Sequence, residues 1–223
     1  MGMDFWAVLE DAFGSQALDL RDRLLTDGDY VRRNADSIRR IVVHHTAVDA
    51  SRSWVVVAAY HVNGNNWPGI GYHLGIARDG VLSYLGDIET VRYHAGRANA
   101  DSIGVCFAGN YMNDEPTAAM LATYARLVSV IEAHLGRQVT IVGHRDVGAT
   151  ACPGDRLYAA LFAPREALPN DEPAATAEKV RWWLEEYARQ LEGNNAERAR
   201  AILYSLIALA YRLEQDGREK ERG

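Results

Sequence analysis

The short stretch of residues 39–45, with an apolar centre, constrains the fold of this chain more than any other part of the sequence. Its centre reads Ile41-Val42-Val43, so apolar, β-branched residues follow one another with no polar residue between them. An uninterrupted run of this length is typical of a strand that is buried on both faces. Such a strand lies inside a sheet that is covered by helices on two sides, and we expect this architecture here.

The first 165 residues alternate between strand and helix patterns. Strands are predicted at residues 39–45, 72–78, 81–86, 102–108 and 138–143, and helices at residues 4–13, 51–62, 117–135 and 155–162. The pair Asp79-Gly80 predicts a hairpin with a two-residue loop between the second and third strands. The pattern therefore predicts the α/β class, with a central mixed β-sheet flanked by helices.

One of these segments, residues 51–62, fits two structures. Three consecutive valines favour a strand, whereas a capping position at Asp49 or Ser51 and an Asn-Gly-Asn-Asn stop favour a helix. We predict a helix.

The composition divides the chain into four segments. We predict an N-terminal helical and loop extension (1–38), a main domain (39–165), a linker rich in Pro, Ala and acidic residues (166–175) and a C-terminal α-helical hairpin (176–223). Both hairpin helices are amphipathic, and so small a unit buries too little apolar surface to be stable alone. We expect it to pack on the main domain, to form a homo-oligomer, or to bind another molecule.

Charge and composition exclude several classes of function. The chain has 24 basic and 30 acidic residues, a net charge of −6 and no basic stripe, which argues against nucleic acid as a partner. No apolar run approaches the roughly 20 residues of a membrane span. Two cysteines are too few for a disulfide scaffold, and the N-terminus has no signal-peptide pattern. We therefore expect synthesis in a reducing cytoplasm.

Histidine and cysteine residues at strand ends suggest a metal site. His144 ends a predicted strand, and Cys152 follows it after a loop long enough to turn back. Imidazole and thiolate together suit Zn²⁺, and three protein ligands would leave one position open for water, as in catalytic sites. The third ligand is either His44 or His45, which point to opposite faces of a strand. The alternative is that His144 merely ends a strand and Cys152 is a small buried side chain.

Four motifs in order, IVVHHTA, GIGYHLGIARDG, HAGRANADSIGVCFAGN and VGHRDVGATACPGD, resemble the type 2 N-acetylmuramoyl-L-alanine amidases. This superfamily includes phage endolysins, bacterial wall and recycling amidases, and animal peptidoglycan recognition proteins. The resemblance covers residues 39–162 and implies the amidase and recognition-protein type of fold. It also implies one zinc ion, Zn²⁺, held by His44, His144 and Cys152.

The resemblance further implies two catalytic residues. Tyr72 matches the family's catalytic tyrosine, and its neutral phenol can donate a hydrogen bond to an oxyanion. Many phage and recycling members have lysine at the position of Thr150, whereas the animal recognition amidases have threonine there, as this chain does. We expect Thr150 to polarise the substrate carbonyl. One recycling subgroup has a glutamate on the strand that contains Cys106 and Ala108, and its absence here weakens the recycling interpretation.

Other polar residues receive either a substrate-binding or a structural role. His94 matches a cleft-lining histidine of the family, and with Arg97 and Asn99 it is predicted to bind substrate. We expect His45 and His73 to be buried and hydrogen bonded, and Cys106 to be an inert core thiol. The pair Arg145-Asp146 is expected to brace the loop that leads to Cys152.

The leading functional hypothesis is zinc-dependent hydrolysis of the amide bond between N-acetylmuramic acid and L-alanine in peptidoglycan. We expect a bacteriolytic enzyme of the phage or prophage endolysin type, made without a signal peptide and acting on the cell wall after release. The alternatives are an intracellular amidase that recycles muropeptides and a non-catalytic peptidoglycan-binding module. The C-terminal hairpin is then predicted to bind wall polymer or to mediate oligomerisation.

Overall fold

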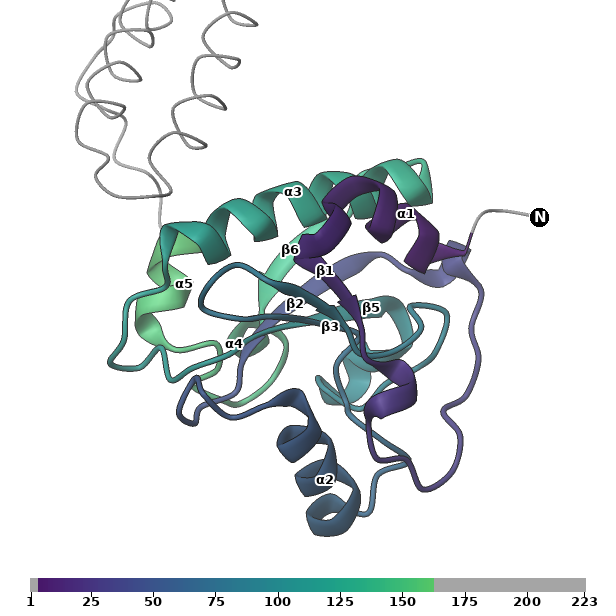
Figure 1. Cartoon of the computed structure of the whole chain (residues 1–223), viewed down its shortest axis with the longest axis horizontal. Coiled ribbons are helices and arrows are strands. Elements are labelled where there is room, and N and C mark those ends of the chain that lie inside the picture. The colour runs from purple at the N-terminus through teal and green to yellow at the C-terminus, as the bar shows by residue number, and fades with distance from the viewer. Residues whose placement is uncertain (1–3, 163–223) are drawn as a thin grey trace, which may run out of the picture. The chain divides into compact units, whose positions relative to one another are not determined.

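The computed structural model describes residues 4–162, which form one six-stranded sheet between helices (Figure 1). The strands are β1 (Ala17–Asp19), β2 (Arg40–His45), β3 (Leu74–Ile76), β4 (Leu82–Tyr84), β5 (Ser102–Phe107) and β6 (Thr140–Gly143). The helices are α1 (Phe5–Phe13), α2 (Trp54–Asn65), α3 (Ala118–Leu135), α4 (His144–Val147) and α5 (Asp155–Phe162). Short 3-10 turns lie at Gly14–Gln16, Arg21–Arg23, Ala35–Ser37 and Gly96–Asp101.

The sheet is mixed, in the order β1-β4-β3-β5-β2-β6, which confirms the predicted α/β class. β2 pairs in parallel with β5 on one side and with β6 on the other. Among the six strands of residues 4–162, only β3 and β4 form an antiparallel pair. Ile41, Val42 and Val43 are fully buried, as the uninterrupted apolar run predicts. Because β2, β5 and β6 are parallel, their carboxyl ends lie at the same end of the sheet. A functional site of an open α/β sheet is expected there.

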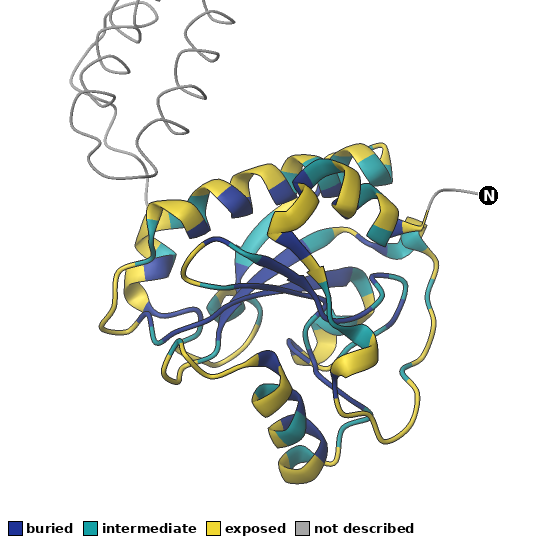
Figure 2. Ribbon diagram, viewed as in Figure 1, coloured by how far each residue is buried: buried dark blue, intermediate teal, exposed yellow. Residues whose placement is uncertain are grey.

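Strand alternation divides the interior into two layers. α1 and α3 cover one face of the sheet and α2 the other (Figures 1 and 2). Ile41 and Val43 belong to the larger core, which lies under α1 and α3. The smaller core contains Trp54 of α2 and Cys106 of β5. Because successive side chains of a strand point to opposite faces, His44 points toward the α2 layer and His45 toward the larger core.

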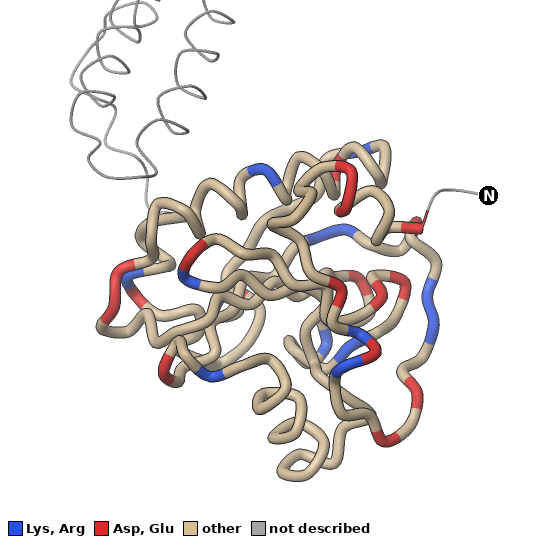
Figure 3. Tube along the Cα trace, in the orientation of Figure 1, with Lys and Arg blue, Asp and Glu red and all other residues tan. Residues whose placement is uncertain are grey.

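The helix predicted at residues 51–62 is confirmed, although it begins three residues later. The Asp49 carboxylate accepts a hydrogen bond from the Ser51 amide at 2.8 Å, which forms a turn before the helix. α2 ends where Asn66 takes a left-handed conformation with φ of 55°. From Trp54 to Asn65 it carries no Lys, Arg, Asp or Glu (Figure 3).

Other elements differ in detail from their predictions. The hairpin between β3 and β4 is confirmed, but both strands are shorter than predicted, and Ala77 and Val81 close a three-residue loop. Gly80 ends that loop with φ of +87°, a conformation that glycine adopts without strain. The chain before residue 38 contributes α1 to the larger core and β1 to the sheet edge, and β1 was not predicted.

The linker and the C-terminal hairpin lie outside the described residues, so the predictions for them stay predictions. Within residues 4–162, no helix combines the length and the apolar character that crossing a membrane requires.

Candidate metal centre

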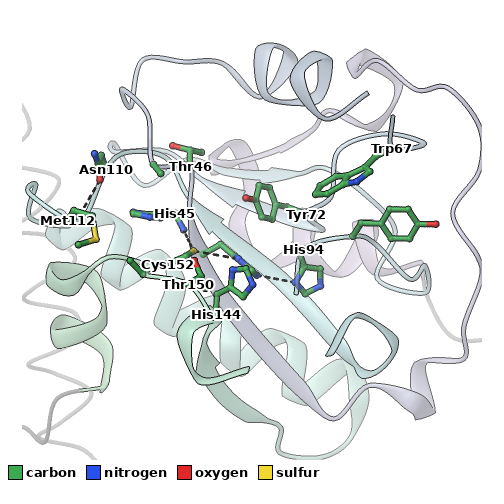
Figure 4. A pocket seen from close by; sticks show the side chains of 14 residues that line it. His45, Thr46, Trp67, Tyr72, His94, Asn110, Met112, His144, Thr150 and Cys152 are labelled. Carbon is green, nitrogen blue, oxygen red and sulfur yellow. Dashed lines mark hydrogen bonds between the residues drawn. The ribbon is translucent and has the colours of Figure 1, made fainter. Parts of the chain in front are cut away.

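A cavity of ≈ 490 Å³ opens at the carboxyl ends of β2 and β6 (Figure 4). It is lined by His44, His45, His94, His144 and Cys152, by the aromatic residues Trp67, Tyr72 and Tyr93, and by Thr46, Ala47, Asn110, Met112, Thr150 and Ala151. Within the described part of the chain, no Lys, Arg, Asp or Glu lines this cavity. Its chemistry therefore comes from imidazole, thiol, phenol and hydroxyl groups.

His44, near the end of β2, is the most deeply placed of the predicted ligands, with 1% of its surface exposed. Its Nδ1 lies 3.7 Å from Cys152 Sγ, and its Nε2 lies 3.0 Å from His94 Nδ1. Burial, followed by the neighbouring His94 and His144, holds the pKa of His44 well below 6.5. The ring is therefore neutral near pH 7, as a metal ligand must be.

His144 and Cys152 reach the same point from the loop after β6. His144 is the first residue of α4, and its ring centroid lies 4.6 Å from that of His44. One ligand atom from each of His44, His144 and Cys152 lies within 4.8 Å of the others. The structure thus brings together the three residues that the family resemblance implies as ligands.

In the absence of a metal ion, the surroundings of Cys152 favour its protonated thiol. Burial raises its pKa to about 11, although the backbone N–H of His45, 3.4 Å from Sγ, and the charge of Arg145 act in the opposite direction. Because the uncharged thiol prevails in this environment, the thiolate needs a cation beside it.

The loop between His144 and Cys152 is braced by the two residues that follow His144. The Arg145 amide donates a hydrogen bond to the Cys152 carbonyl at 2.8 Å, and its guanidinium donates to the Ala151 carbonyl at 2.5 Å. The Asp146 carboxylate accepts a hydrogen bond from the Gly143 amide at 2.7 Å. The bracing predicted for Arg145 and Asp146 is confirmed, and it fixes Cys152 relative to β6.

The donor set fits zinc in its chemistry, and the distance between two of its ligand atoms fits as well. Two imidazoles and one thiolate are borderline-soft ligands, which Zn²⁺ prefers in four-coordinate sites. Bond lengths of about 2.05 Å for nitrogen and about 2.3 Å for sulfur, at a tetrahedral angle, separate the two ligand atoms by about 3.6 Å. The distance from His44 Nδ1 to Cys152 Sγ is 3.7 Å. The residues present therefore fit a zinc ion with one position open to the cavity.

Tyr72 and Thr150 present hydroxyl groups to the same cavity. Tyr72 precedes β3, and its ring centroid lies 5.2 Å from that of His44. Burial raises the pKa of Tyr72 well above 10, so the phenol stays neutral and keeps its proton to donate. The Thr150 hydroxyl oxygen accepts a hydrogen bond from the Cys152 amide at 3.2 Å, which leaves its hydrogen free to point into the cavity.

The three predicted substrate-binding residues have different positions. His94 lines the cavity, but its Nδ1 contacts His44. The Asn99 side-chain oxygen accepts hydrogen bonds from the amides of His94, at 3.0 Å, and Ala95, at 2.6 Å. Arg97 is exposed and is not among the residues that line the cavity. Substrate contact by these residues stays a prediction, and the structure gives His94 and Asn99 contacts within the protein.

Several lining residues were missed by the sequence analysis. Asn110 and Met112 follow the carboxyl end of β5, so the rule that singled out His44 and His144 could have included them. Trp67 and Tyr93 lie on loops outside the strands, and only the fold brings them to the cavity. No pattern in the sequence indicates this proximity.

The residues expected to be structural are buried as predicted. His73 is fully buried, and its Nδ1 accepts a hydrogen bond from the Gly104 amide at 2.9 Å. His45 Nδ1 accepts one from the Tyr111 amide at 3.1 Å. Cys106 is fully buried in β5.

Comparison with known proteins agrees with this geometry. Residues 34–155, more than half of the chain, match the N-acetylmuramoyl-L-alanine amidase family. Peptidoglycan recognition protein 1 of Bos taurus is 33% identical over 137 residues, which cover 57% of this chain and 72% of that protein.

Two solved structures share the fold. Drosophila peptidoglycan recognition protein SD has a TM-score of 0.61 and 22% identity, covering 67% of this chain and 94% of that chain. The endolysin N-acetylmuramoyl-L-alanine amidase LysCS from Clostridium intestinale URNW has a TM-score of 0.52 and 22% identity, covering 63% and 88%. The family match, the sheet and the three converging side chains agree with one another, and the chain belongs to the N-acetylmuramoyl-L-alanine amidase family.

Proposed function

We propose that this chain is a zinc-dependent amidase that cleaves the bond between N-acetylmuramic acid and L-alanine in peptidoglycan. The observation that carries the proposal is the convergence of His44, His144 and Cys152 at one end of a cavity. A protein that only binds peptidoglycan has no need for a thiol and two imidazoles whose ligand atoms lie within 4.8 Å of one another. A bound zinc ion supplies a Lewis acid and lowers the pKa of a coordinated water toward about 7.

The residues around the ligands favour the transition state of amide hydrolysis. As the substrate carbonyl becomes tetrahedral, its oxygen gains negative charge and needs hydrogen-bond donors. Tyr72 supplies a neutral phenol and Thr150 a hydroxyl, both facing the cavity. No carboxylate of the described residues lines the cavity, so neither hydroxyl is bound there by a carboxylate.

A non-catalytic binding module is the second candidate, and the recognition-protein relative favours it. A recycling amidase is the third, and the absence of a carboxylate from the described cavity lining counts against the glutamate-containing subgroup. The endolysin named LysCS supports the bacteriolytic type, so we propose that the chain acts on the intact wall.

Digestion of purified sacculi by the full chain, with mass analysis of the products, separates the three candidates. The proposal predicts free stem peptides with an amino-terminal L-alanine, no product in the presence of a chelator, and recovery when zinc is added. The matched variant Cys152→Ser should release no peptide while the protein still folds. Binding without cleavage would favour the binding module, and cleavage of soluble muropeptides alone would favour the recycling enzyme.

A further inference from the structure

A chain of hydrogen bonds runs from a backbone carbonyl to the deepest of the three ligands. The Ser102 hydroxyl at the start of β5 donates to the Ala98 carbonyl at 2.5 Å. The same oxygen lies 3.4 Å from His94 Nε2, and His94 Nδ1 lies 3.0 Å from His44 Nε2. Ser102, His94 and His44 are all buried.

The direction of each bond follows from the first. Because the hydroxyl hydrogen of Ser102 is taken by Ala98, its oxygen can only accept toward His94, so His94 carries its proton on Nε2. A neutral His94 then has a lone pair on Nδ1 and accepts the Nε2 proton of His44. His44 in this tautomer has a bare Nδ1, the atom that faces Cys152 Sγ at 3.7 Å.

The hydrogen bond between His94 and His44 could also run in the opposite direction with the same number of protons, but His44 could then not bind a metal ion through Nδ1. If His94 donated from Nδ1, His44 would accept on Nε2 and carry its own proton on Nδ1, where it would block a metal ion. His94 Nε2 would then need a donor, and Ser102 has already used its hydrogen on Ala98.

We propose that His94 is a positioning residue that fixes His44 in the tautomer whose Nδ1 binds zinc, and that Ser102 sets the tautomer of His94. The inference rests on the proposed zinc site and gives His94 a role other than substrate contact. A ring nitrogen of a metal-bound histidine is commonly held by such a partner, whose loss costs about 10- to 100-fold in metal affinity.

The surroundings of His94 hold its ring in one place. A Cβ atom added at Gly104 of β5 would lie 2.7 Å from the His94 ring, so the ring occupies space that only glycine leaves. The Asn99 side chain accepts the backbone N–H of His94 at 3.0 Å, which anchors the loop. Ring and backbone are thus both fixed, as a positioning role requires.

Zinc affinity, measured by competition with a chromophoric chelator, tests the proposal in the full chain. His94→Leu removes the acceptor and should weaken zinc binding by about 10- to 100-fold. His94→Asn is the matched variant, because its side-chain oxygen can take the place of Nδ1, and it should stay within about threefold of wild type. Ser102→Ala should give a smaller loss than His94→Leu, since zinc binding itself can reselect the tautomer. Equal affinity for His94→Leu and wild type would overturn the proposal.

The tautomers can also be read from the wild-type protein, which avoids any variant that fails to fold. Long-range ¹H–¹⁵N correlation spectra of the metal-free protein should show His44 and His94 both protonated on Nε2 at neutral pH. A proton on Nδ1 of His94 would overturn the proposal even if zinc binds. Failure of the wild type itself to bind zinc would instead contradict the proposed function, so the two failures are distinguishable.

Discussion

Two groups of histidine rings, all largely enclosed by the protein, differ in what their Nδ1 atoms contact. The first group consists of the predicted ligands His44 and His144, and His44 Nδ1 faces the sulfur of Cys152. In the second group, each Nδ1 accepts a backbone N–H: His45 from Tyr111, His61 from Gly71 and His73 from Gly104. Within residues 4–162, no backbone amide donates to a ring nitrogen of His44 or His144.

This difference separates a ligand from a structural histidine better than burial does. His44 is 1% exposed and His73 is 0% exposed, so exposure gives them the same description. A backbone amide that donates to Nδ1 occupies the lone pair that a metal ion would use and orients the ring for packing. His44 Nδ1 has no such donor among residues 4–162, so it can bind a metal ion.

The neighbours on β2 give the largest expected contrast. His44→Ala should abolish zinc binding and hydrolysis, whereas His45→Ala should keep one zinc ion per chain. Losing the acceptor for the Tyr111 amide should cost about 1–3 kcal/mol in the free energy of unfolding. Mass spectrometry checks the zinc content of both variants, and thermal unfolding of the metal-free variants checks the loss of stability in His45→Ala. A His45→Ala protein that folds but lacks zinc would break the comparison.

Removing the phenol at the cavity should have the next largest effect. Tyr72→Phe should lower the rate of hydrolysis by about 10²- to 10³-fold, because it removes one donor to the developing oxyanion, and zinc content should not change. Tyr124→Phe is the matched control, since Tyr124 belongs to the larger core and its buried hydroxyl has no hydrogen-bond partner among residues 4–162. Equal rates for Tyr72→Phe and wild type would exclude Tyr72 as a catalytic residue.

The sequence predicted the sheet and most helices, but it could not choose between His44 and His45. Both are the last residues of a strand that is buried on two faces, so periodicity could not select either of them as the ligand, and only the family resemblance selected His44. The alternation of side chains along β2 explains why His44 is the proposed ligand. Ile41 and Val43 point into the larger core, so His44 points to the opposite face of the sheet.

Other features were out of reach because they depend on contacts between distant residues. β1 is three residues long and pairs with β4, more than sixty residues away in the sequence. His94 and His44 are likewise separated by fifty residues. Local patterns contain no information about which ring nitrogen faces which partner.

Zinc affinity should depend on pH through the ligand group. Because burial raises the pKa of Cys152 to about 11, the metal-free thiol is protonated, and binding must release that proton. The apparent affinity should therefore rise about tenfold per pH unit between pH 7 and 9, where the histidines are already neutral. A chelator competition series checks the slope, and an affinity independent of pH in this range would argue against thiolate ligation.

The histidines that accept a backbone N–H, among them His45 and His61, should determine how the stability of the metal-free protein changes at acidic pH. Burial lowers the pKa of His45 and of His61 to about 4, below the unfolded value of about 6.5. The unfolded chain therefore binds more protons between these values, and stability is full above pH 6.5 and falls toward pH 4. Each ring should contribute up to about 1.4 kcal/mol per pH unit in that window. Urea unfolding at several pH values measures the slope, and His61→Gln should reduce it.

The most direct test of the metal centre is X-ray absorption at the zinc edge of the zinc-loaded full chain. The account predicts a four-coordinate ion with two nitrogen ligands near 2.0–2.1 Å, one sulfur near 2.3 Å and one further light atom. The sulfur contribution should vanish or the zinc should be lost in Cys152→Ala, and neither should change in Cys106→Ala. A zinc ion with no sulfur in its coordination shell, or no bound zinc at all, would contradict the account.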